Sequence, residues 1–292
     1  MSAIEHEIAS QPDVWRRAAV LARGADANLP APSSRLAVIG CGTSLYMAQA
    51  YAVAREAAGQ GETDAFAASE APPARRYDAV LAISRSGTTT EVVRALEGMP
   101  AGVARYSVVG VAETPVAIAA DHRIVLDFAD EESVVQTRFA TTALVLLLAH
   151  AGIDVEAAAA EAERALTADL PVDPSAAEGF VFLGRGWTVG LANEAALKLR
   201  EAALAWAEAY PALEYRHGPI ALAGPRTVVW PIGDVEPDLL EDVRATGATV
   251  VTNGQHPLAD LVLAQRTAVA LAKARSLDPD TPRNLTRSVV LQ

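Results

Sequence analysis

Three shortages mark this 292-residue sequence: one cysteine, two lysines among its 24 basic residues, and no long apolar run. A single cysteine, Cys41, excludes an intrachain disulfide. The longest apolar run, Ala143–Ala149, is far shorter than the roughly 20 residues that cross a bilayer, so no membrane partner is expected. The N-terminal segment is polar and lacks the apolar core of a signal peptide. The sequence therefore predicts a cytoplasmic protein.

Positive charge is also scarce. The 24 Lys and Arg residues face 36 Asp and Glu, which gives a formal net charge of −12. Broad nucleic-acid binding needs Lys and Arg to displace counterions from phosphates, so no nucleic-acid partner is expected. A small anionic ligand is compatible with this charge, because a few backbone N–H groups can bind phosphate without net positive charge. With 51% hydrophobic and 21% charged residues, the composition excludes a wholly disordered chain.

Strand-like and helix-like patterns alternate along the chain. Short apolar runs predict strands at 35–40, 78–84, 106–112, 123–128, 179–183, 227–232 and 248–252. Helical patterns cover 3–23, 44–58, 89–97, 137–152, 193–206, 236–245 and 258–275. This alternation predicts an α/β fold with parallel sheets.

The two halves of the chain open alike, which predicts two related domains. VIGCGTS in the first half and FLGRGWT in the second each join a strand to a helix through a glycine-containing turn, a weak internal repeat. Residues 168–178 (ADLPVDPSAAE) have the composition of a linker. We therefore expect an N-terminal helix within 1–27, a first domain at 28–167, this linker, and a second domain with a C-terminal tail at 179–292.

Two loops of the first half combine glycine with hydroxyl side chains directly before a predicted helix. They are Gly40–Ser44 (GCGTS) and Ser84–Glu91 (SRSGTTTE). Small residues let a ligand approach the backbone, and the helix N-terminus supplies free N–H groups. Either loop alone fits ordinary helix capping equally well, but both together favour a phosphate cup, with Arg85 as an added charge. Neither matches a dinucleotide or triphosphate fingerprint, which favours a sugar phosphate.

The second half holds the densest polar cluster. Glu194, Lys198 and Glu201 recur on one face of a predicted helix. His217 follows within the segment 208–219 (EAYPALEYRHGP). A carboxylate and a histidine can act as base and acid on a sugar, although the spacing alone fits a solvated helix surface equally well. No Cys/His cluster has metal-ligand spacing, so neither a metal nor a cofactor is expected.

Taken together, these motifs make the chain resemble the sugar isomerase (SIS) domain family, and within it the isomerase half of glucosamine-6-phosphate synthase. The matching segments are GCGTS at 40–44, Ser69-Glu70, SRSGTTTE at 84–91, the E-x-S-V-x-x-T loop at 131–137, ALKLRE at 196–201, EAYPALEYRHGP at 208–219 and DPDTPRNLTRSV at 278–289. The resemblance covers nearly the whole chain in order. It implies two tandem SIS domains, each a parallel β-sheet flanked by helices.

The resemblance also implies a role for each matching residue. It points to phosphate binding by Thr43, Ser44, Ser84, Arg85, Ser86 and Thr89, and to sugar contact by Glu131, Val134 and Gln136. Glu201 matches the base that moves a proton between sugar C1 and C2, and Lys198 matches a lysine near the reacting carbons. His217 matches the ring-opening residue, which in the family comes from the partner subunit. A homodimer with a shared active site is therefore implied.

Two departures from the synthase pattern matter. The synthase begins with a glutaminase domain and its nucleophilic cysteine, whereas here Met1-Ser2-Ala3 leads straight into a predicted helix, so we expect no glutaminase activity. The synthase also carries a tail lysine that forms a Schiff base with the ketose. This chain has Arg287 there, and a guanidinium stays protonated and cannot form that imine. We expect Arg287 to clamp the sugar or neutralise developing oxyanion charge.

The sequence thus predicts an enzyme that acts on a hexose or hexosamine 6-phosphate, without a cofactor, by proton transfer through Glu201 and His217. It would be an aldose–ketose isomerase or an amino-sugar-6-phosphate deaminase. One alternative is a non-catalytic phosphosugar-binding sensor or subunit, against which the presence of both residues argues, since phosphate binding needs neither. Another is an aminotransferase-type isomerase that receives ammonia from a separate glutaminase.

Overall fold

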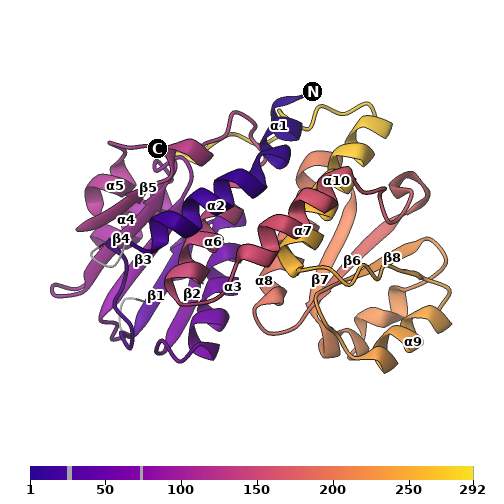
Figure 1. The fold of residues 1–292 in the computed structure, drawn as a ribbon, viewed down its shortest axis with the longest axis horizontal. Coiled ribbons are helices and arrows are strands. Elements are labelled where there is room, and N and C mark those ends of the chain that lie inside the picture. The colour runs from indigo at the N-terminus through magenta and orange to yellow at the C-terminus, as the bar shows by residue number, and fades with distance from the viewer. Residues whose placement is uncertain (25–27, 73–74, 292) are drawn as a thin grey trace.

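A five-stranded and a four-stranded parallel sheet lie side by side in the computed structural model, which describes residues 1–24, 28–72 and 75–291 (Figure 1). The first sheet has the order β2-β1-β3-β4-β5, and the second has the order β7-β6-β8-β9. The strands are β1 (Leu36–Gly40), β2 (Thr63–Ala67), β3 (Ala79–Ser84), β4 (Ala104–Val109), β5 (His122–Val125), β6 (Gly179–Gly184), β7 (Trp206–Pro211), β8 (Thr227–Ile232) and β9 (Thr249–Val250). Every strand pair among the described residues is parallel, as the alternation predicts.

Helices cover both faces of each sheet. They are α1 (Ala3–Ala9), α2 (Gln11–Ala22), α3 (Thr43–Ala57), α4 (Thr90–Glu97), α5 (Pro115–Ala119), α6 (Arg138–His150), α7 (Glu156–Thr167), α8 (Thr188–Ala203), α9 (Pro237–Ala245) and α10 (Pro257–Ala274). Short 3₁₀ turns lie at Ala68–Glu70, Asp127–Ala129, Pro174–Ala176, Ala212–Arg216 and Pro219–Leu222. None of the helices in the described ranges combines the length and the apolar content needed to cross a membrane.

One apolar core joins the two sheets. It includes Val38 of β1, Phe139 of α6, Phe180 of β6 and Leu261 of α10, all buried. The outer face of the first sheet packs separately under α4 and α5, and the outer face of the second packs under α9. The parallel α/β architecture is thereby confirmed. That each sheet is a SIS domain, and that the domains divide at 167 and 179, stay predictions.

Several predicted boundaries are wrong, for identifiable reasons. The predicted helix over 3–23 is two helices, α1 and α2, because the chain turns at Ser10 and restarts at Gln11 and Pro12, where a proline without an N–H is tolerated. The predicted helix over 193–206 starts earlier and ends at Ala203, because Leu204 adopts a left-handed φ of 51°.

Four elements gave too weak a pattern to be predicted. They are β2, α5, α7 and β7. The two strands lie at sheet edges and are mostly half-buried or exposed, so their sequences show no clear alternation. Helix α7 buries mainly alanines, which give little contrast between its apolar and polar faces.

Helix α3 and helix α8 cross at very close range, and this crossing positions the site described below. A Cβ added at Gly190 of α8 would lie 2.5 Å from the carbonyl oxygen of Tyr46 on α3, so only glycine fits there. The Asn193 side chain also donates a hydrogen bond of 3.2 Å to Gln49 of α3. The close approach brings the second half of the chain against the N-terminal turn of α3.

Candidate active site

The carboxyl ends of β1 and β3 form a crevice at the point where the strand order reverses. The two strands are paired neighbours, but the chain continues from β1 outward to β2 and from β3 in the opposite direction to β4. The loops that follow lead into α3 and α4, whose N-termini both face this edge. Such switch points are the usual ligand sites of open α/β sheets, and helix N-termini favour anions there.

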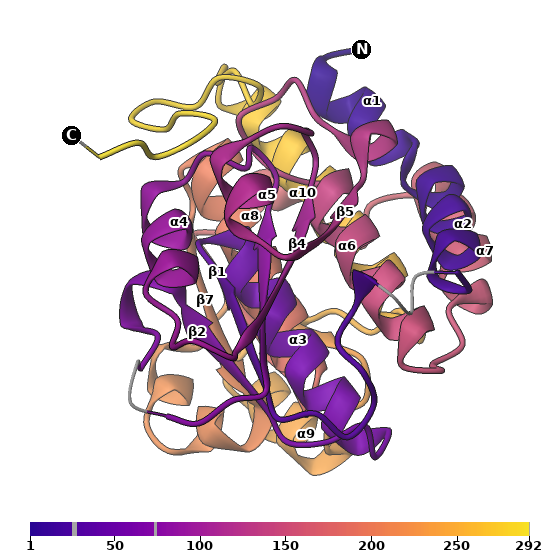
Figure 2. The same cartoon turned by 90° about the vertical axis from the view of Figure 1, so that its left-hand side faces the viewer.

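A cavity of about 190 Å³ lies at this edge. It is lined by Cys41, Gly42, Thr43, Arg85, Thr89, Glu91, Val134, Gln136, Glu201, Leu285, Thr286, Arg287, Ser288 and Val289. Five parts of the chain therefore meet here: the two glycine–hydroxyl loops, the loop after β5, helix α8 and the C-terminal tail. Figure 2 shows the tail, in yellow, passing above α4 toward the C-terminus.

The structure brings together only part of the predicted site. Of the predicted residues, the cavity is lined by Thr43, Arg85, Thr89, Val134, Gln136, Glu201 and Arg287, and not by Ser44, Ser84, Ser86, Glu131, Lys198 or His217. Ser84 and Ser86 shape the loop from within: the Ser84 hydroxyl accepts the Gly87 N–H at 3.2 Å, and the Ser86 hydroxyl accepts the Thr88 N–H at 3.3 Å. Ser44 is buried in the first turn of α3.

Arg85 links the loop after β5 to the C-terminal tail through hydrogen bonds. Its guanidinium donates to the carbonyl oxygens of Ser133 at 2.8 Å, Val134 at 3.1 Å and Arg287 at 3.1 Å. Its side chain is buried, and the Glu131 carboxylate lies 3.8 Å away. The Arg85 guanidinium, which the sequence predicts to bind phosphate, thus holds the loop after β5 and the tail at the cavity.

Lys198 occupies the centre of a buried polar cluster below the cavity. Its ammonium donates to the Thr43 hydroxyl at 3.0 Å and to the Glu201 carboxylate at 2.5 Å, and it lies 3.3 Å from the Glu194 carboxylate. The side chains of Lys198 and Glu194 are each 1% exposed, whereas that of Glu201 is 20% exposed. Of the three charged groups, Glu201 is therefore the one that lines the cavity.

Burial and mutual attraction set the charges of this cluster. Burial raises the pKa of Glu194 to about 7, against the attraction of Lys198. Burial alone would lower the pKa of Lys198, but the carboxylates of Glu194 and Glu201 outweigh it and hold that pKa above the usual 10.5. The ammonium is therefore charged, a hydrogen-bond donor rather than a nucleophile.

Glu131 does not line this cavity, and its contact with the sugar stays a prediction. One of its oxygens accepts the Thr137 N–H at 2.5 Å, the Thr137 hydroxyl at 2.8 Å and the Arg138 N–H at 2.8 Å. The fully buried carboxylate therefore caps the N-terminus of α6, where a negative charge is favourable. Val134 and Gln136, further along the same loop, line the cavity.

Arg287 lines the cavity, whereas His217 lies elsewhere on the same chain. The Arg287 guanidinium donates to the Asp130 carboxylate at 2.5 Å and to the carbonyl oxygen of Glu131, so it fastens the tail instead of extending toward Glu201. His217 follows the 3₁₀ turn at Ala212–Arg216 in the second half, where it is exposed. Within one chain it does not line the cavity.

Sequence reasoning missed Glu91 and the tail residues at the cavity. Glu91 Oε2 and Gln136 Oε1 are buried oxygens with no hydrogen-bond partner among the described residues. In the tail, the Ser288 hydroxyl accepts from Thr88 at 2.8 Å and the Val289 carbonyl accepts the Thr90 N–H at 3.2 Å. The available signals were the position of Glu91 within SRSGTTTE and of the tail within the motif at 278–289.

These features define the class of the chain: a parallel α/β protein with a small, hydroxyl-lined ligand cavity at the switch point of its first sheet. The sequence model of the SIS domain matches residues 31–151, which include β1, β3 and both loops. A segment of the first half therefore matches the SIS domain, the family that the motifs of the chain resemble.

Curated relatives align with most of the chain. It is 28% identical over 297 residues to the glutamine–fructose-6-phosphate aminotransferase (isomerizing) of Sulfurisphaera tokodaii, an alignment that covers 89% of this chain and 50% of that protein. The corresponding protein of Sulfolobus acidocaldarius is 28% identical over 298 residues, with the same coverage of 89% and 50%. The chain thus spans about half the length of these curated relatives.

Solved structures share the complete fold. The glucosamine-6-phosphate deaminase of Thermotoga maritima superposes with a TM-score of 0.82 at 25% identity, covering 99% of this chain and 100% of that one. The tagatose-6-phosphate ketose/aldose isomerase of Escherichia coli superposes with a TM-score of 0.80 at 20% identity, covering 98% of this chain and 97% of that one. The second likeness shows the shared fold alone.

Proposed function

We propose that the chain is an enzyme that binds a hexose or hexosamine 6-phosphate and moves a proton between two neighbouring sugar carbons. It would act as an aldose–ketose isomerase or as an amino-sugar-6-phosphate deaminase. The observation that carries the proposal is the contact of Lys198 with both Glu201 and Thr43, which joins a base and a buried cation to a helix N-terminus at one cavity. The names of the deaminase and aminotransferase relatives support the same class of substrate.

In this proposal the phosphate lies against the N-termini of α3 and α4. The side chains of Arg85, Lys198 and Arg287 are engaged elsewhere, so backbone N–H groups and hydroxyls do the binding. Thr43 and Thr89 line the cavity, and Ser84 and Ser86 hold the second loop in shape. The unpartnered oxygens of Glu91 and Gln136, which also line the cavity, accept hydrogen bonds from sugar hydroxyls or from an ammonium group.

Glu201 then carries the proton in either reaction. In the isomerase, its carboxylate removes a proton from C1 of the open-chain ketose and returns it to C2, which leaves the aldose. The charged Lys198, which lies behind Glu201, stabilises the enediolate that forms between these steps through its positive charge. In the deaminase, the proton moves from C2 to C1 of the open-chain amino sugar and leaves an imine at C2. One water molecule hydrolyses that imine to the ketose and ammonia.

The remaining predicted residues take supporting roles. The sequence predicts that Arg287 clamps the sugar. Its contacts favour a positioning role instead, in which it fastens the tail over the cavity. His217 opens the sugar ring from a second copy of the chain, a role that its exposed position leaves open to it. A homodimer and a cytoplasmic location belong to the same proposal.

The test is a substrate panel. The protein is incubated with hexose 6-phosphates and hexosamine 6-phosphates, and ketose formation and free ammonia are followed together. Release of ammonia with ketose identifies the deaminase, and ketose alone identifies the isomerase. A further arm with fructose 6-phosphate and added ammonia tests the aminotransferase direction. Thermal stabilisation by sugar phosphates without any turnover would contradict the enzyme and support the binding module.

A further inference from the structure

Helix α1 contacts the loop that supplies part of the cavity wall. The Glu7 carboxylate is 2% exposed, and one of its oxygens accepts the Glu132 N–H at 2.6 Å and the Ser133 N–H at 3.1 Å. Its other oxygen accepts the Ser133 hydroxyl. The next residues of this loop include Val134 and Gln136, which line the cavity. Glu7 therefore holds the loop at the point where it turns toward the ligand space.

The same helix also holds the C-terminal tail. The Asp280 carboxylate accepts the N–H groups of Ala3 at 3.0 Å and Ile4 at 2.8 Å, at the N-terminus of α1. A carboxylate at this position is favoured by the helix dipole. The Asp280 carbonyl oxygen accepts the Val134 N–H at 2.9 Å. Helix, loop and tail are thus joined in a closed ring of hydrogen bonds beside the cavity.

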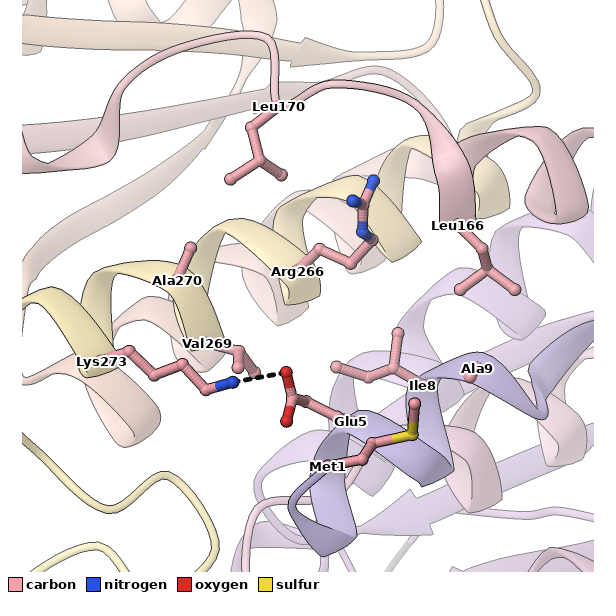
Figure 3. Close-up of a pocket in the computed structure, with 10 residues that line it drawn as sticks. All are labelled: Met1, Glu5, Ile8, Ala9, Leu166, Leu170, Arg266, Val269, Ala270 and Lys273. Carbon is pink, nitrogen blue, oxygen red and sulfur yellow. Dashed lines mark hydrogen bonds and ion pairs between the residues drawn. The ribbon is translucent and has the colours of Figure 1, made fainter.

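Helix α1 itself is fixed to the second half of the molecule. Figure 3 shows Glu5 and Ile8 of α1 facing Val269 and Lys273 of α10 across an apolar groove. The Lys273 ammonium donates to the Glu5 carboxylate at 2.5 Å, and Ile8 is buried. These contacts hold α1 against α10, and Glu7 reaches the loop from this helix.

The loop depends on these contacts because it has no regular structure of its own. Residues 130–137 lie between the 3₁₀ turn at Asp127–Ala129 and α6 and belong to no helix or strand. Hydrogen bonds to a buried carboxylate are among the stronger ones, and leaving such groups unpaired is costly. We propose that Glu7 is a positioning residue that sets the cavity loop and, with Asp280, the tail that covers the cavity. Its effect on kinetics rests on the function proposed above, whereas its effect on the loop does not.

The test compares Glu7→Gln with the unmutated protein by amide hydrogen exchange and by kinetics. We expect the amides of 132–134 and of the tail to exchange about tenfold faster or more, while those of α6 and β3 are unchanged. For a sugar phosphate substrate, KM should rise about tenfold with kcat nearly constant, and the pH profile of kcat should not move. Glu163→Gln removes an exposed ion pair between Glu163 of α7 and Arg16 of α2; it is the matched control and should change neither measurement.

A second variant protects the test against misfolding. Ser133→Ala removes one of the three donors to Glu7 with little change in volume and should give the same pattern more weakly. The double variant should be no worse than Glu7→Gln alone, since both act through one contact. Unchanged exchange at 132–134 in both variants would overturn the proposal. If the unmutated protein turns over no sugar phosphate, the proposed function fails, and the exchange data still decide whether Glu7 sets the loop.

Discussion

The ammonium of Lys198 lies 2.5 Å from the carboxylate of Glu201, and both project from the same helix, α8. Glu201, the base of the proposed proton transfer, therefore contacts the ammonium whose positive charge would stabilise the enediolate. The carboxylates of Glu194, one turn earlier on the helix, and of Glu201 together hold the pKa of this ammonium above its usual value. Burying charged side chains costs desolvation free energy. The position of this ion pair beside a ligand cavity therefore points to a catalytic role rather than a packing role.

The first prediction concerns pH and Glu194. Burial raises the pKa of this carboxyl from 4.5 to about 7, so between these values the folded protein binds a proton that the unfolded chain has released. The free energy of unfolding should therefore fall as pH rises from 4.5 to 7, by at most about 1.4 kcal/mol per pH unit from this group. Urea unfolding of the unmutated protein and of Glu194→Gln at several pH values measures the effect. The variant cannot ionise there and should lose this slope; an identical slope in both proteins would contradict the assignment.

The second prediction concerns the crossing of α3 and α8. A Cβ at Gly190 would lie 2.5 Å from the Tyr46 carbonyl oxygen, so Gly190→Ala should destabilise the fold by roughly 1–3 kcal/mol. It should also weaken the stabilisation by sugar phosphates, because the contact between Lys198 and Thr43 depends on this crossing. Thermal melts with and without glucosamine 6-phosphate measure both effects. Gly224→Ala is the control, since a Cβ there meets nothing within 4 Å; equal behaviour of the two variants would refute the argument.

The third prediction concerns Arg287. Borohydride with fructose 6-phosphate should trap no covalent adduct on the tail, because a guanidinium forms no imine. Arg287→Lys should raise KM severalfold, since one ammonium cannot reproduce the paired contacts to Asp130 and Glu131. The new amine faces the Asp130 carboxylate, so it should stay charged and also resist trapping. Mass spectrometry of the treated proteins checks these outcomes, and an adduct on Lys198 would show that the reaction runs through an imine on α8.

The fourth prediction concerns the proposed shared site. If His217 serves the cavity of a second copy, then Glu201→Gln and His217→Ala homodimers should each be nearly inactive. After unfolding and refolding in an equal mixture, random pairing should restore about a quarter of the unmutated activity, because each hybrid dimer holds one intact site. No recovery, in a mixture that light scattering shows to be dimeric, would place His217 outside the partner's site.

The sequence predicts much of this architecture because local patterns dominate it. The buried strands β1, β3, β6 and β8 are short apolar runs, and their glycine-rich ends mark the switch points directly. The edge strands β2 and β7 escape prediction because their exposed residues follow no strict alternation.

The sequence predicts which types of residue form the site, but it does not predict most of the contacts between them. Glu194, Lys198 and Glu201 share a helix face, and the spacing alone shows this. That Arg85 bonds to backbone carbonyls, and that Glu131 caps α6, depends on where the loop after β5 and the tail settle. The contact between Arg85 and Ser133 joins residues 48 positions apart, and no local pattern encodes it.

Exchange of substrate hydrogen with solvent tests the central claim most directly. The unmutated protein in deuterated water should place deuterium at C1 or C2 of the sugar phosphate that it accepts, measured by NMR of the recovered sugar. Glu201→Gln should still be stabilised against heat by that sugar phosphate, yet its exchange should fall by about 10²–10⁴-fold, because an amide cannot accept the proton. Exchange that persists at the unmutated rate in Glu201→Gln would contradict the assignment of this carboxylate as the base.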